Sequence, residues 1–154
     1  MMSVSRMLAL LPLTLLLLPV AFGASLQTGT GSFTTTVSNV HSRSAGGNTI
    51  ASMDVSFALT GAFSGTCVGK ESAVMHRDGS ATFHGTCAFT GMGAGKQGTI
   101  TFVFGGHSTS KSFKGHFTSI SSGGGLSGLH VHGTFTPTGP TTGDYSVEFH
   151  FSNA

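Results

Sequence analysis

The sequence has few charged residues, no tryptophan and a single tyrosine. Charged residues make up 8% of the 154 residues, against about 25% in an average soluble protein. Lysine and arginine number 7, aspartate and glutamate number 5, and the basic residues form no stripe. These shortages argue against a protein that binds nucleic acid, and they give no support to electrostatic binding of anionic membranes. The polar surface must consist mainly of serine, threonine, glycine and histidine.

The motifs of the common enzyme and metal-binding classes are also missing. The chain has no G-x-S-x-G, no H-E-x-x-H and no C-x-x-C. The glycine-rich stretch GMGAG at 91–95 precedes no helical pattern, so it lacks the helix N-terminus that a phosphate-binding loop needs. We therefore expect no cofactor, and no motif names a reaction.

One long apolar run is present, at the N-terminus. Arg6 precedes an almost uninterrupted apolar segment at 7–22, and small residues follow it. This order is typical of a secretory signal peptide, which we place at 1–24. The run is shorter than the ~20 residues that a membrane span needs. We expect residues 25–154 to form one exported domain, secreted or periplasmic, with no membrane span after the signal is removed.

Cysteine occurs twice, at Cys67 and Cys87. An even number of cysteines in an exported chain favours a disulfide. Closing a loop of this length would stabilise the fold by about 3 kcal/mol in the chain-entropy model.

Beyond the apolar run, the sequence alternates between apolar and polar residues with a period of two. In MDVSFAL, for example, Met53, Val55, Phe57 and Leu59 share one face, and no 3.6-residue period is visible. The connections are short and rich in glycine, and RDGS is a hairpin signal. The segments expected to be strands are 32–40, 53–59, 65–76, 80–90, 99–104, 112–118, 126–135 and 145–151. This pattern predicts an all-β fold, a single eight-stranded antiparallel up-and-down barrel, with a β-sandwich as the alternative.

Glycines recur inside the expected strands, and we expect them to mark bulges and sharp bends. They include Gly61, Gly65, Gly69, Gly85, Gly115, Gly128 and Gly133.

An ordered series of glycines and phenylalanines resembles a known family. The series lies in FSGTCVGKESAVMHRDGSATFHGTCAFTGMGAGKQGTITF and GGGLSGLHVHGTF. It consists of Phe63-x-Gly65, Gly69, Asp78-Gly79, Phe83-x-Gly85, Gly98, Gly125-x-x-Gly128-Leu129 and Phe135. The chain is similar over about 30–152 to the bacterial domain-of-unknown-function family 3224, whose members look like small, calycin-type barrels akin to allene oxide cyclase. Barrels of this kind include an isomerase that cyclises an unsaturated epoxide and dirigent proteins, but no catalytic residue of either matches a position here.

A barrel built from these strands would have a lumen lined by phenylalanine. The residues expected to line it are Phe57, Phe83, Phe102, Phe104, Phe117 and Phe149. An eight-stranded barrel has room either for packed side chains or for one small ligand.

The hairpin around RDGS decides which charged residue faces this lumen. If its loop is Arg77-Asp78-Gly79, Glu71 shares a face with Phe89 and points inward. If the loop is only Asp78-Gly79, Lys70 points inward instead. A bulge, or a position at the barrel mouth, would leave both charges in water. A buried charge is costly unless it is paired, so Glu71 and Lys70 are the candidate catalytic residues.

The first of these registers also bears on the disulfide. It places Cys67 opposite Phe89, one diagonal away from Cys87, so we expect a bulge at Gly69 or Gly85 to bring the sulfurs together.

The last two strands place histidines outward. If they form a hairpin centred near Pro140, His130 lies opposite His150 and His132 opposite Glu148. Three imidazoles and a carboxylate could bind zinc, copper or nickel. We expect no functional metal site here, because the cluster faces water and lacks an enclosing second layer of side chains.

Three functions are consistent with these features. The first is a secreted barrel that binds a small hydrophobic molecule in its lumen. The second is a cyclase or isomerase acting in the same cavity, with an inward Glu71 as acid or base. The third is an extracellular structural or surface-binding module that uses the serine, threonine and histidine surface. We rank them in this order, and the ranking leans away from an enzyme.

Overall fold

The computed structural model describes residues 24–152, and the expected signal peptide at 1–24 lies almost entirely outside this range. All eight expected strands form, each longer at one or both ends than the alternating segment that predicted it. They are β1 (Gln27–Ala45), β2 (Asn48–Gly61), β3 (Phe63–Met75), β4 (Ala81–Gly93), β5 (Lys96–Ser108), β6 (Phe113–Gly124), β7 (Leu129–Pro137) and β8 (Thr142–Phe151). The described range contains no helix that is long and apolar enough to cross a bilayer.

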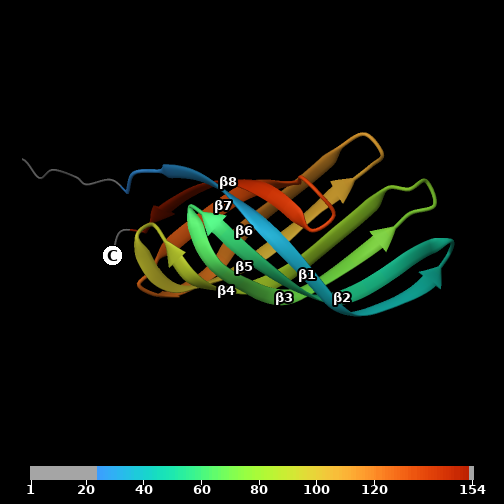
Figure 1. Ribbon diagram of the computed structural model, residues 1–154, viewed down its shortest axis with the longest axis horizontal. Helices are drawn as coiled ribbons and strands as arrows, with labels where there is room; N and C mark the ends of the chain where they lie inside the picture. The colour runs from blue at the N-terminus through green and yellow to red at the C-terminus, as the bar shows by residue number, and fades with distance from the viewer. Residues whose placement is uncertain (1–23, 153–154) are drawn as a thin grey trace, which may run out of the picture.

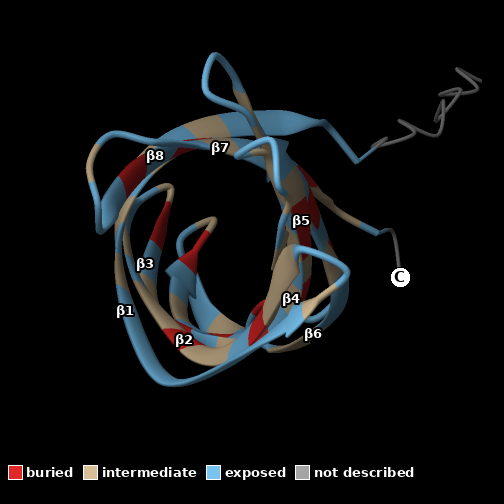
Figure 2. Cartoon of the chain, turned by 90° about the vertical axis from the view of Figure 1, so that its right-hand side faces the viewer, coloured by how far each residue is buried: buried red, intermediate tan, exposed pale blue. Residues whose placement is uncertain are grey.

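The strands form a closed antiparallel barrel. Each strand pairs with the next along the chain, and β1 closes the ring by pairing with β8 from Gln27↔Phe149 to Thr34↔Thr142. Figure 1 shows the ring from the side, and Figure 2 shows it from one end. The prediction of an up-and-down barrel is confirmed, and the sandwich alternative is wrong because one continuous sheet closes on itself.

Aromatic rings inside the barrel lie over glycines on neighbouring strands. Phe117 on β6 pairs with Gly133 on β7, and a Cβ at Gly133 would collide with the Phe117 ring. The same arrangement joins Phe33 to Gly143, Phe63 to Gly93, Phe83 to Gly106, Phe104 to Gly85, Phe135 to Gly115 and Tyr145 to Gly31. Alternating large and small residues lets many rings fit inside a narrow barrel.

The expectation that the in-strand glycines mark bulges is therefore wrong. In the described chain the strand register shifts at Ser38–His41 in β1 and beside Ile120 in β6, and neither place holds a glycine. Gly85, Gly115 and Gly133 stay in regular pairing. Glycine is needed at these three positions because an aromatic ring occupies the space that a side chain would fill.

The two ends of the barrel differ. At the closed end, where the β2–β3, β4–β5 and β6–β7 turns lie, the lumen is filled by Phe63, Phe89, Ile100, Leu126 and Leu129, each at most 2% exposed. At the open end lie the β1–β2, β3–β4, β5–β6 and β7–β8 turns, and several of the hairpins extend beyond the ring on the right of Figure 1. Aromatic side chains at this end are only partly buried.

Candidate functional site

A cavity of about 80 Å³ lies in the lumen and is not enclosed on every side. Its lining consists of Phe33, Phe57, Leu59, Cys67, Cys87, Phe102, Phe104, Phe117, Phe135 and Tyr145. The rings meet edge to face, as at Phe57–Phe104, whose centroids are 5.4 Å apart, and Phe102–Phe117, at 5.5 Å. The wall is therefore almost wholly apolar.

Of the six phenylalanines expected to line the lumen, the structure brings four together around this cavity. Phe57, Phe102, Phe104 and Phe117 line it. Phe149 packs against Phe63 at the closed end, with centroids 5.8 Å apart. Phe83 lies nearer the open end and stacks on Phe113 at 5.6 Å. Both point inward as expected, but at other heights along the barrel axis.

Sequence reasoning did not single out the other lining residues. Phe33, Leu59, Phe135 and Tyr145 also belong to the cavity. The alternation of apolar and polar residues in the sequence is consistent with an inward position for all four. The sequence does not show how far along the barrel axis each of these residues lies, because that position depends on the stagger between strands.

The disulfide joins Cys67 on β3 to Cys87 on β4 and forms part of the cavity wall. Cys67 lies opposite Phe89 and Cys87 opposite Gly69, so the two cysteines are diagonal neighbours. The expected bulge is wrong, because the β3–β4 ladder is regular and the Cα atoms are only 5.4 Å apart. Gly69 permits this approach: a Cβ there would collide with the Thr86 carbonyl and crowd the Cys87 Cα.

The RDGS hairpin has the register with a three-residue loop. Met75 pairs with Ala81, the Gly79 N–H donates to the His76 carbonyl at 3.0 Å, and Gly79 has φ +84°. Glu71 is therefore on the same face as Cys67 and points inward, opposite Met53 and Gly85. Partial burial raises the pKa of the Glu71 carboxyl above its usual value.

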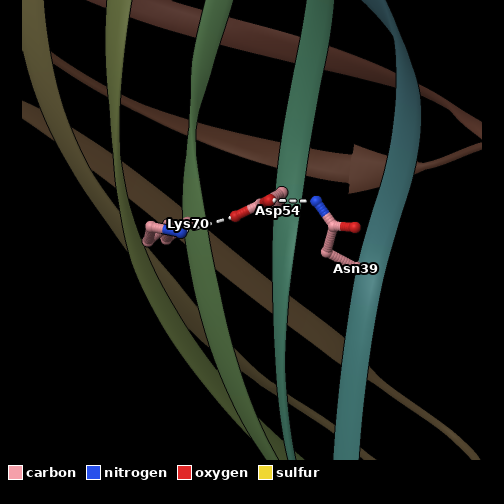
Figure 3. Close-up of polar contacts among 3 residues, drawn as sticks. All are labelled: Asn39, Asp54 and Lys70. Carbon is pink, nitrogen blue, oxygen red and sulfur yellow. Dashed lines mark hydrogen bonds and ion pairs between the residues drawn. The ribbon is translucent and has the colours of Figure 1, made fainter.

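Lys70, the other candidate, points outward. Its Nζ donates to Asp54 Oδ1 at 2.7 Å, and its side chain is 83% exposed. Asn39 Nδ2 donates to the other oxygen, Oδ2, at 2.7 Å, as Figure 3 shows. These two hydrogen bonds, that of Asn39 first, lower the pKa of Asp54. The arrangement keeps Lys70 away from the lumen.

The outward cluster borders a polar hollow of about 380 Å³ on the β1–β3 wall. It is lined by Asn39, His41, Ser52, Met53, Asp54, Lys70, Glu71 and Ser72. Asn39 has φ +49° at the β1 register shift, which turns its amide towards Asp54. The hydrogen bonds that Asn39 and Lys70 donate to Asp54 account for this arrangement of side chains, so no ligand is needed to explain it.

Tyr145 contributes a hydroxyl to the cavity lining, but that hydroxyl is already hydrogen-bonded. It accepts from the Phe63 N–H at 2.9 Å and donates to the Thr60 carbonyl at 2.8 Å or the Phe63 carbonyl at 3.0 Å. Desolvation raises the pKa of Tyr145. The hydroxyl therefore fixes the β2–β3 turn.

The outward histidines lie in the expected register. His130 is opposite His150, with stacked rings 5.2 Å apart, and His132 is opposite Glu148, with Nε2–Oε2 at 2.8 Å. The four side chains form two separate pairs. Among residues 24–152, no group of three or more histidine, cysteine, aspartate or glutamate side chains is arranged to hold a metal ion.

The fold and the site together define a small antiparallel β-barrel whose apolar lumen is open at one end. A disulfide between two neighbouring strands forms part of the lumen wall. The family model described as protein of unknown function DUF3224 matches residues 28–151, and the chain belongs to this family. No curated protein matches the chain significantly.

Among the solved structures that share the fold are two proteins of unknown function. One is a DUF3224-family protein of unknown function from Shewanella oneidensis MR-1, with a TM-score of 0.74 and 21% identity over 84% of this chain and 100% of that one. The other is a conserved protein of unknown function from Rhodopseudomonas palustris, with a TM-score of 0.55 and 12% identity over the same shares. At these identities the likeness shows the fold alone.

Proposed function

We propose that this protein binds a small apolar molecule in the lumen of the barrel. The observation that carries the proposal is the cavity of about 80 Å³, walled by phenylalanine rings, Leu59 and the disulfide. A water molecule inside a protein needs two to four polar partners. The one hydroxyl in the lining, that of Tyr145, is already hydrogen-bonded to the backbone. Transfer of an apolar ligand from water into this cavity is therefore favourable, and the ligand does not have to displace a bound water molecule.

The size of the cavity limits the ligand. Drug-sized ligands occupy pockets of about 300–1,000 Å³. A cavity of about 80 Å³ suits a short alkyl chain or one small ring, with the rest of a larger molecule extending towards the open end.

The test is an NMR titration with 1-octanol, a neutral probe. We expect saturable one-to-one binding, with the largest shifts at Phe57, Phe104 and Phe117. Native mass spectrometry of the protein as isolated would then identify a natural ligand by its mass. A titration without saturation, or shifts scattered over the outer face, would contradict the proposal.

A cavity-filling variant sharpens this test. Leu59→Trp occupies much of the cavity and should weaken octanol binding by about tenfold or more, since the alkyl chain loses its apolar contacts. Val68→Trp is the matched control, because Val68 is 57% exposed and points outward from β3. Leu59→Phe, a smaller change, serves if the tryptophan variant does not fold.

Catalysis in the same cavity is the second candidate, and the inward Glu71 favours it. Partial burial raises the pKa of this carboxyl, which suits proton transfer nearer neutral pH. The bound molecule recovered from wild type and from Glu71→Gln distinguishes the two functions. An isomerase yields a different isomer ratio from each protein. A binder yields the same single compound from both, in a smaller amount from the variant if Glu71 contributes to binding.

We also propose that the barrel works outside the cytoplasm. The Cys67–Cys87 disulfide is typical of an oxidising compartment, and the apolar run at 7–22 supports export through a signal peptide. Mass spectrometry of the periplasm and medium of the producing cells would find a chain that begins near residue 25. A cytoplasmic chain that retains residues 1–24 would contradict export.

A further inference from the structure

Glu71 is the charged side chain that faces the lumen. Among residues 24–152, Asp144 and Glu148 occupy exposed outward positions on β8, Asp54 pairs with Lys70 on the outer face, and Asp78 lies in a turn. The arginines and the other lysines lie on the outer face, in turns or at the closed end. In this part of the chain, the lumen therefore contains a negative charge and no positive charge.

The neighbours of Glu71 connect it to the cavity. Its partner on β4 is Gly85, which has no side chain, and the ring of Phe104 lies over that glycine. Phe104 lines the cavity. On the other side, Met53 on β2 adds apolar surface. Glu71 therefore lies on the open-end side of the cavity, and neither of its cross-strand partners carries a polar side chain. It also borders the polar hollow, where Asp54 and Lys70 are already paired with each other.

Within residues 24–152, Glu71 has no polar partner. Among the described residues its carboxylate makes no hydrogen bond and no ion pair, and desolvation is the cause that raises its pKa. Lys70, the next residue, is turned away to Asp54. A partly desolvated carboxylate without a counter-charge is unfavourable, and a cation that reaches it forms a strong, charge-assisted hydrogen bond.

We propose that the ligand is an amphipathic amine, whose apolar body fills the cavity and whose ammonium group is bound by Glu71. This inference rests on the proposed function and names its ligand class. Cys67 in the cavity wall and Glu71 are four residues apart on β3, about 13 Å along the strand. An eight-carbon tail, together with the glutamate side chain, spans this distance. A ligand carboxylate at the same place would be repelled.

The test compares three probes with the same tail at neutral pH: octylamine, 1-octanol and octanoate. Calorimetry on the purified, disulfide-bonded protein should show octylamine binding about tenfold more tightly than 1-octanol, and octanoate more weakly than both. In Glu71→Gln the preference for the amine should disappear, while 1-octanol binds as it does to wild type.

Glu148→Gln is the matched control, because Glu148 is an exposed carboxylate on the outer face of β8. It should keep the full preference for the amine. The amine assignment is wrong if 1-octanol binds but wild type shows no preference for octylamine. It is also wrong if Glu71→Gln keeps the preference of wild type for octylamine. In both cases the proposal that the lumen binds an apolar molecule stands. If none of the three probes binds, the proposed function fails together with the amine.

Discussion

The two ends of the barrel are built from the same kinds of residue but have different interiors. At the closed end, Phe63, Phe89 and Leu126 are at most 1% exposed and fill the lumen. At the open end, Phe33, Phe113 and Phe135 are only partly buried, and Glu71 faces inward. Both ends place phenylalanines over inward glycines, so this pairing does not decide whether the lumen is filled.

The difference comes from the turns. Leu126, in the turn between β6 and β7, folds back into the barrel and is fully buried. Backbone hydrogen bonds hold it there: its N–H donates to Gly123 at 3.2 Å, and its carbonyl accepts from Leu129 at 3.0 Å. The turns at the open end, including His76–Ser80, contribute no buried residue to the core. One inward-folded turn therefore separates a packed end from a hollow one.

The largest predicted effect tests this contrast by truncating one phenylalanine at each end. Phe89→Ala should lower the free energy of unfolding by about 3–5 kcal/mol, because the ring is fully buried and its removal leaves a cavity. Phe135→Ala should cost about 1–2 kcal/mol, since its ring is partly exposed and borders space that is already empty. Urea unfolding followed by circular dichroism measures both. Equal losses would show that the open end is packed in solution.

A smaller effect should follow from removing one hydroxyl near the closed end. Tyr145→Phe leaves the Phe63 N–H and the Thr60 carbonyl without their hydrogen bonds. We expect a loss of about 1–3 kcal/mol, the usual consequence of an unsatisfied buried polar group. Ser32→Ala is the control, because it removes an exposed hydrogen bond to Asp144 and should change stability by less than about 0.5 kcal/mol. A Tyr145→Phe variant as stable as wild type would show that water replaces the hydroxyl.

The sequence predicted the strands and their inward faces because both follow from a period of two. It predicted the pairing of His130 with His150 for a related reason: a single short turn near Pro140 fixes the β7–β8 register. It did not predict which phenylalanines meet at one height, because strand stagger is a property of the closed ring. Phe149 and Phe83 were expected at the cavity and lie on either side of it.

The sequence also did not decide which charged residue, Lys70 or Glu71, faces the lumen. Asp78-Gly79 predicted a hairpin but allowed two loops, and a shift of one residue exchanges the faces of Lys70 and Glu71. The backbone settled the choice through the His76–Gly79 hydrogen bond. The disulfide and its diagonal register were predicted, but the bulge expected to bring the sulfurs together was wrong. Gly69 lets β3 and β4 approach closely without one, an effect that residue counting does not contain.

The smallest predicted effect concerns Glu71 and depends on pH. The folded barrel raises the pKa of this carboxyl above the ordinary value of 4.5 through desolvation, so the folded state holds the proton more tightly than the unfolded chain. Wild type should therefore lose stability as the pH rises from about 4.5 through the raised, folded-state pKa, and the loss is absent at lower pH. Glu71→Gln should not show this loss.

The measurement is a pair of stability curves against pH, obtained by urea unfolding of wild type and Glu71→Gln. We expect the curves to run together below pH about 4.5 and to separate above it, with the variant more stable by less than about 1 kcal/mol because the carboxylate keeps some contact with water. Saturating octylamine should raise the stability of wild type more than that of the variant, since it supplies a counter-charge that residues 24–152 do not place beside Glu71. A variant less stable than wild type at neutral pH would mean that Glu71 already has a favourable partner, and the open end would then be as well satisfied as the closed one.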